Sequence, residues 1–239
     1  MKFVAVKSCQ GSLGKNKGTE RAPSLILKGI NKSDLNIPNG DIIKTAEILE
    51  KADGDFFVGG DHSITYGLFK GFAKKSKNSG LIVFDAHPDC VNNFSPPTHE
   101  DFLRVLVEEN VVKPENIVLV GLRKAHFIER EFIKNNKIKC IYMKDIISEE
   151  NVIEQIKGFV KNLEAFYLSI DIDVLDPKFA PGTGYPEKKG FDLKSLLVIL
   201  EGIKNMNIKR ADLVEVNPLK DKNSITVNSA KRILKIFNS

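Results

Sequence analysis

The feature that most constrains the fold is an alternation of short apolar runs with longer segments of helical periodicity. Seven runs rich in β-branched and aromatic residues are predicted as buried strands: Phe3–Val6, Phe56–Val58, Leu81–Phe84, Ile117–Val120, Cys140–Met143, Phe166–Ile170 and Leu213–Val216. Seven segments have apolar residues at helical spacing: Ile42–Leu49, Ile64–Ala73, Phe102–Val107, Glu129–Lys134, Val152–Leu163, Leu193–Ile203 and Ile225–Ile236. Such alternation is typical of a parallel sheet covered by helices on both faces.

Local signals refine this prediction. Ser148 is followed by two glutamates and Asp192 precedes an apolar periodic segment, so both residues are predicted as helix starts. The segment Leu35–Ile37, next to Pro38, would supply an eighth strand. Because the sequence contains no internal repeat and no long Pro/Gly-rich linker, residues 1–239 are predicted to form one α/β domain with a parallel sheet of about eight strands.

The composition excludes several other classes of protein. With 42% hydrophobic and 28% charged residues, the chain is predicted to be globular rather than disordered. The net charge of +5 is spread along the sequence, so we expect no nucleic-acid partner, and no apolar run approaches the roughly 20 residues of a membrane span. Three cysteines without a CxxC pair, and an N-terminal segment too short for a signal peptide, predict a cytoplasmic location.

Unusual polar clusters follow four of the predicted strands. They are Gly59–Ser63 (GGDHS), Asp85–Asp89 (DAHPD), Asp171–Asp173 (DID) and Glu215–Pro218 (EVNP). In open parallel sheets, ligands bind outside the carboxyl ends of the strands, where the loops converge. Segments that are distant in sequence are therefore expected to meet at one edge of the sheet.

The spacing of these acids points to metal ions. In DAHPD and in Ser169–Asp173 (SIDID) the polar residues recur at every second position, so an extended chain would project them to one side. Buried carboxylates need a cation, and Asp85, Asp89, Asp171 and Asp173 carry four negative charges that two divalent ions would neutralise. With His62 and His87 as imidazole ligands the site favours manganese, while zinc, iron and cobalt stay open as alternatives.

The motifs GGDHS, DAHPD and SIDIDVLDP, in this order, closely resemble the three metal-binding motifs of the ureohydrolase family, which includes arginase and agmatinase. The resemblance continues through Lys17–Pro23, Ala180–Gly184 and Val214–Pro218 and covers nearly the whole chain. It implies a three-layer αβα arginase-like fold and a small guanidino compound as substrate. It also implies a homo-oligomer, a trimer or hexamer.

The same resemblance implies roles for individual residues. One manganese ion would be bound by His62, Asp85, Asp89 and Asp171, and a second by Asp85, His87, Asp171 and Asp173, with Asp85 and Asp171 bridging. A hydroxide between the metals would attack the guanidinium carbon and release urea and an amine. Glu215 matches the glutamate that pairs with the guanidinium, and His99 matches a histidine credited with proton transfer.

Departures from the family pattern bear on the substrate. Glu100 replaces the glycine that usually follows the histidine, and Lys124 and His126 stand where arginases carry acids that hold the substrate's α-amino group. Arginine is therefore disfavoured, and the spacing from Asp89 to His99 is more like that of agmatinase. Lys124 and His126 would suit an anionic substrate tail, whereas Glu100 would suit a cationic one.

Several alternatives stay open at this point. The chain could be a formiminoglutamase or guanidino-acid hydrolase of the same family, a deacetylase-like amide hydrolase with one zinc, or a non-catalytic metal-binding homologue. His99 could instead cap a helix that begins at Glu100, and Gly11–Lys15 is interpreted as a plain loop. The preferred hypothesis is a dinuclear manganese hydrolase that cleaves a linear C–N bond, with agmatinase-like specificity.

Overall fold

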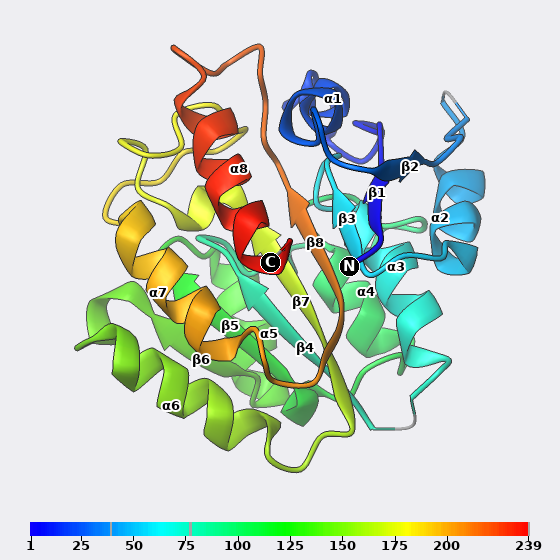
Figure 1. Ribbon diagram of the computed structural model, residues 1–239. Helices are drawn as coiled ribbons and strands as arrows, with labels where there is room; N and C mark the ends of the chain where they lie inside the picture. Colours follow the sequence, from blue (N-terminus) through cyan, green and yellow to red (C-terminus); the bar gives the residue numbers. More distant parts are fainter. Residues whose placement is uncertain (39, 77, 239) are drawn as a thin grey trace.

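Eight parallel strands form the central sheet of the computed structural model, which describes residues 1–38, 40–76 and 78–238 (Figure 1). The strands lie in the order β2-β1-β3-β8-β7-β4-β5-β6. Their bounds are β1 Phe3–Ala5, β2 Lys32–Asp34, β3 Phe56–Val58, β4 Ser79–Phe84, β5 Ile117–Leu122, β6 Lys139–Tyr142, β7 Ala165–Asp171 and β8 Ile208–Val214. Every neighbouring pair is parallel, as the alternating sequence pattern predicts.

Helices cover both faces of the sheet, each over its own apolar cluster. One face packs against α1 (Ala22–Ile26), α6 (Glu149–Val160), α7 (Leu193–Ile203) and α8 (Ile225–Phe237) (Figure 1). The opposite face packs against α2 (Ile42–Lys51), α3 (Ile64–Ala73), α4 (Phe102–Glu108) and α5 (Phe127–Asn136). Single 3₁₀ turns lie at Thr19–Arg21, Pro114–Asn116, Met143–Asp145 and Ile172–Val174. The three-layer α/β prediction is confirmed.

The predicted helix starts are confirmed by side-chain caps. Ser148 accepts a hydrogen bond from the backbone of Asn151 at 3.2 Å, and Asp192 accepts one from Ser195 at 2.8 Å. The eight residues from Ile42 to Leu49 and the segment after Ile64 also form helices as predicted. Amphipathic periodicity together with a polar cap is therefore sufficient to locate these elements.

Two strand predictions were wrong in their bounds. The eighth strand is Lys32–Asp34, not Leu35–Ile37, because an edge strand needs backbone pairing but no apolar side chains. Strand β8 begins at Ile208 and ends before Glu215, so the predicted Leu213–Val216 covers only its end. The first part of the strand was not predicted because the charged residue Arg210 interrupts the apolar run. Arg210 is nevertheless buried, and its guanidinium donates to the carbonyls of Leu68 and Ala52.

The strand order places the polar clusters side by side. The neighbouring strands β3, β8, β7 and β4 occupy the middle of the sheet, and the chain leaves each of them at its carboxyl end. The clusters after these four strands therefore meet at one edge, as predicted. Among the described residues, no helix combines the length and apolar character that a membrane crossing requires.

Candidate metal centre

Two glycines make the turn that carries His62 into the centre. Gly59 and Gly60 have φ angles of 96° and 87°, a left-handed conformation that glycine adopts without strain. A Cβ atom at Gly59 would also collide with the ring of Pro23. The next residue, Asp61, accepts hydrogen bonds from the backbones of Gly11 and Ser63, so the loop holds His62 buried at 1% exposure.

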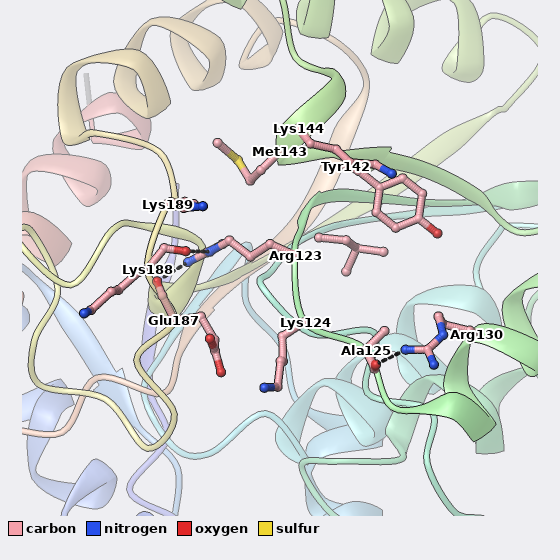
Figure 2. A pocket seen from close by; sticks show the side chains of 11 residues that line it. Arg123, Lys124, Ala125, Arg130, Tyr142, Met143, Lys144, Glu187, Lys188 and Lys189 are labelled. Carbon is pink, nitrogen blue, oxygen red and sulfur yellow. Dashed lines mark hydrogen bonds between the residues drawn. The ribbon is translucent and has the colours of Figure 1, made fainter.

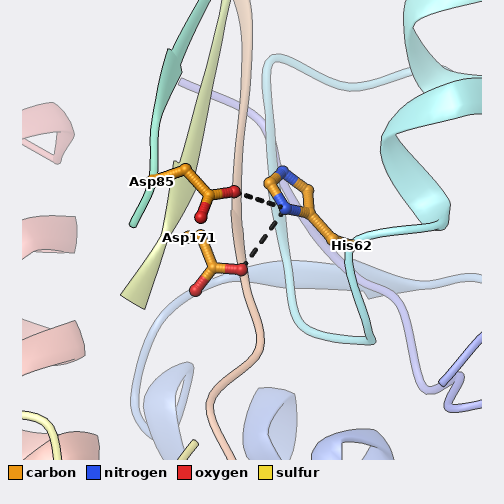
Figure 3. A group of neighbouring side chains, drawn as sticks. All are labelled: His62, Asp85 and Asp171. Carbon is orange, nitrogen blue, oxygen red and sulfur yellow. Dashed lines mark ion pairs between the residues drawn. The ribbon is translucent and has the colours of Figure 1, made fainter. Parts of the chain in front are cut away.

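Three carboxylates converge on one ring nitrogen of His62. Its Nδ1 atom lies 2.9 Å from Asp89 Oδ2, 3.1 Å from Asp85 Oδ2 and 3.3 Å from Asp171 Oδ2. Figure 3 shows Asp85 and Asp171 directed at this nitrogen from two neighbouring strand ends. One nitrogen carries at most one proton, so hydrogen bonds to His62 cannot satisfy three carboxylates at once.

A second group adjoins the first and shares Asp85. His87 Nδ1 lies 2.9 Å from Asp173 Oδ2 and 3.7 Å from Asp85 Oδ1. The ligand atoms of Asp85, His87 and Asp173 lie close enough to hold one cation, as do those of His62, Asp85 and Asp171. All six predicted metal ligands are thus brought together in two adjacent groups.

The backbone achieves this convergence differently from the prediction. Strand β4 ends at Phe84 and β7 ends at Asp171, so the alternating spacing does not continue along extended strands. Asp173 lies in a 3₁₀ turn whose first residue follows Asp171, and Asp89 has a φ of 50°. Left-handed backbone at a non-glycine residue is uncommon, and it concentrates at functional sites.

Hydrogen bonds on the far side of His62 determine how its ring is protonated. The hydroxyl groups of Thr65 and Tyr167 donate to Asp212 Oδ2 at 2.7 and 2.6 Å, and Ser169 donates to Asp212 Oδ1 at 2.6 Å. Because the Ser169 proton is directed at Asp212, its Oγ accepts from His62 Nε2 at 2.9 Å. In a neutral ring Nδ1 then carries a lone pair, and it faces three carboxylates.

The residues present fit a metal ion. His62 Nδ1 and Asp85 Oδ2 are buried and make no hydrogen bond of good geometry within the described residues. A lone pair facing carboxylate oxygens is repulsive unless a cation lies between them. Mixed carboxylate and imidazole ligands suit a divalent ion of the first transition row. The two groups can therefore hold metal ions, with Asp85 common to both.

The electrostatics of the acids agree with a missing positive charge. Burial and the nearby Asp85 charge raise the pKa of Asp89 to about 8. Burial, Asp173 and Asp85 raise the pKa of Asp171 well above its ordinary value. Burial opposes ionisation of Asp85 as well, but the neighbouring imidazoles of His62 and His87 lower its pKa overall. Raised carboxyl pKa values are the result expected when acids are crowded together without a cation.

Glu215 lies beside the two groups with its carboxylate already engaged. Oε1 accepts from the His62 backbone at 2.7 Å and from His99 Nδ1 at 3.1 Å, and Oε2 accepts from the Asn16 amide. Glu215 follows β8 with a φ of 64°, so it belongs to the loop and not to the strand. The segment Gly11–Lys15 forms turns without helix or strand, as predicted, and the next residue, Asn16, is fully buried in the site.

His99 is a member of the site and does not cap a helix. Helix α4 begins at Phe102 after Asp101, and no side chain caps it. Burial alone would lower the pKa of His99, but the hydrogen bond and charge of Glu215 raise it to about 9. Its Nε2 atom is buried and makes no hydrogen bond with any residue that the structure describes. His99 therefore carries a proton at neutral pH, and its Nε2 atom, 3.9 Å from Glu100 Oε1, is not engaged in a hydrogen bond with the described residues.

A cavity of about 430 Å³ opens over the metal groups. The predicted substrate residues Glu100, Lys124, His126 and Glu215 all line it, together with His99. Sequence reasoning missed several further lining residues, among them Tyr185 and Glu187. The Tyr185 hydroxyl donates to Glu100 at 3.0 Å, and Glu187 lies 3.9 Å from His87 Nε2. Neither residue belongs to a recognisable motif, so no sequence signal singled them out.

Comparison with known proteins assigns the chain to a family. The model of the arginase family matches residues 15–237. This chain belongs to the arginase family. It is 34% identical to the arginase of Staphylococcus aureus strain COL, over 93% of this chain and 82% of that protein. The family assignment agrees with the two adjoining metal groups and supports hydrolysis of guanidino C–N bonds.

Other members of the arginase family resemble the chain to a similar degree. The agmatinase of Bacillus subtilis is 34% identical over 79% of this chain and 64% of its own length. The crystal structure of Entamoeba histolytica arginase in complex with L-ornithine superposes with a TM-score of 0.87 at 26% identity, covering 100% of this chain and 98% of that one. The arginase and agmatinase relatives are each 34% identical to this chain, and the arginase aligns with more of it. Identity alone does not assign the substrate, which is argued from the cavity.

One predicted substrate residue of this arginase-family chain has a structural role. His126 caps α5, where its Nδ1 atom accepts from the Ile128 backbone at 3.4 Å. In return, Glu129 accepts from the His126 backbone at 2.7 Å and from the Cys90 backbone at 3.2 Å. This capping box joins the loop after β5 to the loop that carries Asp89. The His-x-x-Glu spacing of His126 and Glu129 was the sequence signal that could have indicated this capping box.

Proposed function

We propose that this chain is a dinuclear manganese hydrolase that cleaves a linear C–N bond of a guanidino compound, with agmatinase-like specificity, and releases urea and an amine. The observation that carries the proposal is the pair of buried acid–imidazole groups that share Asp85 beside Glu215. When bound, two divalent ions lower the pKa of water and supply a nucleophile at neutral pH. The arguments below concern what the protein's own residues contribute.

Glu215 recognises the guanidinium in competition with His99. Oε1 already accepts two hydrogen bonds, while Oε2 accepts one from Asn16 and keeps one acceptor position. A guanidinium that binds through both oxygens must therefore displace the His99 Nδ1 proton from Oε1. This differs from the sequence expectation of a freely available carboxylate, and it couples substrate binding to the position of His99.

His99 is suited to deliver a proton to the leaving amine. Its raised pKa of about 9 keeps it protonated at neutral pH, and its unpartnered Nε2 atom belongs to a residue that lines the cavity. When the C–N bond breaks, the departing nitrogen takes up this proton, so His99 acts as the general acid. Release of His99 from Glu215 by the substrate would lower the pKa of His99 and favour that transfer.

The charges at the mouth of the cavity favour a cationic substrate tail. Glu100 and Glu187 both line the cavity, and an ammonium group such as that of agmatine would lie between carboxylates. Lys124 also lines the cavity and would repel such a tail. The Nδ1 atom of His126, the other basic residue predicted there, is already engaged at the helix cap. Arginine is disfavoured because Lys124 and His126 occupy positions where acids would hold its α-amino group.

Metal identity, location and assembly complete the proposal. Manganese is proposed because carboxylates outnumber imidazoles among the six ligands, with zinc, iron and cobalt as alternatives. A cytoplasmic location is supported by three free thiols, Cys9, Cys90 and Cys140. The proposed homo-oligomer of three or six chains is supported by the family resemblance alone.

The deciding experiment measures metal content together with product release, which is urea from the guanidines and formamide from formiminoglutamate. The purified protein, reconstituted with manganese, is offered agmatine, arginine, guanidinobutyrate, guanidinopropionate and formiminoglutamate. We expect two manganese ions per chain and fastest urea release from agmatine. One zinc ion with amide hydrolysis would favour a deacetylase-like enzyme, and two metals without turnover of any compound would favour a non-catalytic homologue. Fastest turnover of an anionic compound would contradict the proposed preference for a cationic substrate tail.

A further inference from the structure

A second cavity, of about 820 Å³, adjoins the catalytic cavity and is strongly basic. It lies between the loops after β5 and β6 and the segment that contains Glu187, and we call it the basic cavity (Figure 2). Six of the residues that line it are cationic, and Glu187 is its single acid. The six are Arg123, Lys124, Arg130, Lys144, Lys188 and Lys189. Figure 2 shows Lys188 extending away from the others.

The positive charge of the basic cavity is not neutralised by ion pairs. Within residues 1–38, 40–76 and 78–238, none of the six cations lies within 4.0 Å of a carboxylate oxygen. Elsewhere lysines pair readily, as Lys70 does with Glu109 at 2.9 Å and Lys204 with Glu201 at 2.6 Å. Six cations without an ion pair therefore line one hollow.

Arg123 contributes a fixed charge to this hollow. Its guanidinium donates to five backbone carbonyls, among them those of Glu187 at 3.0 Å and Lys188 at 3.1 Å. Carbonyl groups hold the side chain in place but carry no formal charge, and no carboxylate forms an ion pair with it in the described part of the chain, although nearby acids such as Asp173 and Glu187 favour its charged form. Arg130 donates to the Ala125 carbonyl at 2.7 Å, and the Lys144 ammonium lies 5.8 Å from the centre of the Tyr142 ring.

A cleft lined by charges of one sign concentrates counter-ions, and arginine and lysine are the side chains that bind phosphate groups. The basic cavity also has apolar lining from Leu122 and Met143 and an aromatic ring from Tyr142, which suits the organic part of a small ligand. We propose that the basic cavity binds a small phosphate-bearing anion. This site is separate from the metal groups.

Two charged residues connect the basic cavity to the catalytic cavity. Lys124 and Glu187 line both, and Figure 2 shows both side chains beneath Arg123. An anion in the basic cavity attracts the Lys124 ammonium and reduces its repulsion of a cationic substrate tail. The bound anion therefore strengthens the binding of agmatine. This regulatory effect rests on the proposed function, whereas the binding of the anion does not.

The binding experiment uses metal-free protein, so that phosphate cannot bind at the metal groups. After treatment with a chelator and dialysis, inorganic phosphate and pyrophosphate are titrated by calorimetry against a chloride blank of equal ionic strength. We expect one saturable site per chain that Lys144→Gln and Arg130→Gln each weaken by at least about fivefold. The matched control is Lys157→Gln, which removes an exposed lysine that pairs with Glu154.

Each outcome decides the proposal. Absence of saturable binding, or binding that neither variant weakens, would overturn the anion site, and so would preferential binding of single-stranded RNA. The regulatory effect is measured as KM for agmatine with and without phosphate, at constant ionic strength and metal content. We expect KM to fall with phosphate in the wild type and to stay constant in Lys144→Gln. Anion binding without guanidine hydrolysis would contradict the proposed function while leaving the anion site established.

Discussion

The Nε2 atom of His62 lies 2.9 Å from the Oγ atom of Ser169, and this contact decides which ring nitrogen faces the acid cluster. The Ser169 proton is directed at Asp212, so Ser169 is an acceptor toward His62 and leaves Nδ1 as a ligand atom. Residues beyond the ligands commonly fix the tautomer of a metal-binding histidine in this way. Asp212 therefore acts on the metal centre from behind Ser169.

Replacing Asp212 by asparagine should weaken metal binding without touching a ligand. The amide of Asp212→Asn can donate to Ser169, which would turn the serine hydroxyl toward Nε2 and move the histidine proton to Nδ1. We expect metal affinity to fall by about 10- to 100-fold, measured by competition with a chelator. The control is Tyr167→Phe, which removes another hydrogen bond to Asp212 but leaves Ser169 unchanged. Equal affinity loss in both variants would contradict the tautomer argument.

Asp171→Asn tests the bridging role. The Asp171 carboxylate faces His62 Nδ1 through Oδ2 and accepts the Asp173 backbone through Oδ1 at 2.7 Å. We propose that Asp171 serves both metal positions, so loss of its charge is expected to lower kcat by at least about a hundredfold and to reduce metal retention. Elemental analysis and urea release measure the two effects. Normal metal content with normal turnover would remove Asp171 from the centre.

The sequence predicted the location of the centre because polar residues that follow buried parallel strands all lie at the same edge of the sheet. His62 lies in the loop after β3, Asp85 directly follows β4 and Asp171 is the last residue of β7, and parallel strands bring their carboxyl ends to the same edge. Buried acids at those positions needed a cation whatever the details of the loops. Both the position of the candidate ligands and the fold class therefore followed from local pattern.

The remaining parts of the site depend on contacts between distant segments. Asn16 reaches Glu215 across 199 positions, and Tyr185 reaches Glu100 across 85. No periodicity records such pairs, because each arises from the packing of two loops against each other. The positive φ of Glu215 was equally hidden, since its apolar neighbours Val214 and Val216 resemble a continuing strand. Loop packing fixes substrate contacts, so specificity was the least predictable feature.

Stability should fall between pH 6.5 and about 9 because of His99. Glu215 raises the His99 pKa from 6.5 to about 9, so the folded state binds a proton that the unfolded state has lost. The stabilisation is complete below pH 6.5 and disappears as pH rises through 9, with a limit of roughly 3 kcal/mol. Urea denaturation at several pH values gives the free energy of unfolding. The dependence of this free energy on pH should be weaker in His99→Asn. An unchanged slope in that variant would assign the effect to other groups.

Glu215→Gln should separate catalysis from metal binding. Glutamine keeps the size and one acceptor oxygen of Glu215 but removes the charge that attracts both His99 and the guanidinium. Metal content should stay at the wild-type value while kcat/KM falls by at least about tenfold, equivalent to roughly 1.4 kcal/mol. The His99 pKa should also fall toward 6.5, which shifts the pH profile. Wild-type rates on every guanidine would exclude the pairing role.

Lys124→Asp should increase selectivity for a cationic substrate tail. Lys124 is the cation in the cavity wall whose side chain is free of a helix cap, and Glu100 and Glu187 line the same cavity. Reversal of its charge removes a repulsion and adds an attraction, so the ratio of kcat/KM for agmatine to that for guanidinobutyrate should rise by at least about tenfold. The comparison variant Lys124→Gln removes the charge alone and should give an intermediate ratio.

Both compounds carry the same guanidinium, so a defect at the metal groups or at Glu215 would lower both rates and leave the ratio unchanged. If the ratio stays constant in both variants while turnover persists, Lys124 does not face the bound tail, and specificity must come from Glu100, Tyr185 and Glu187 instead.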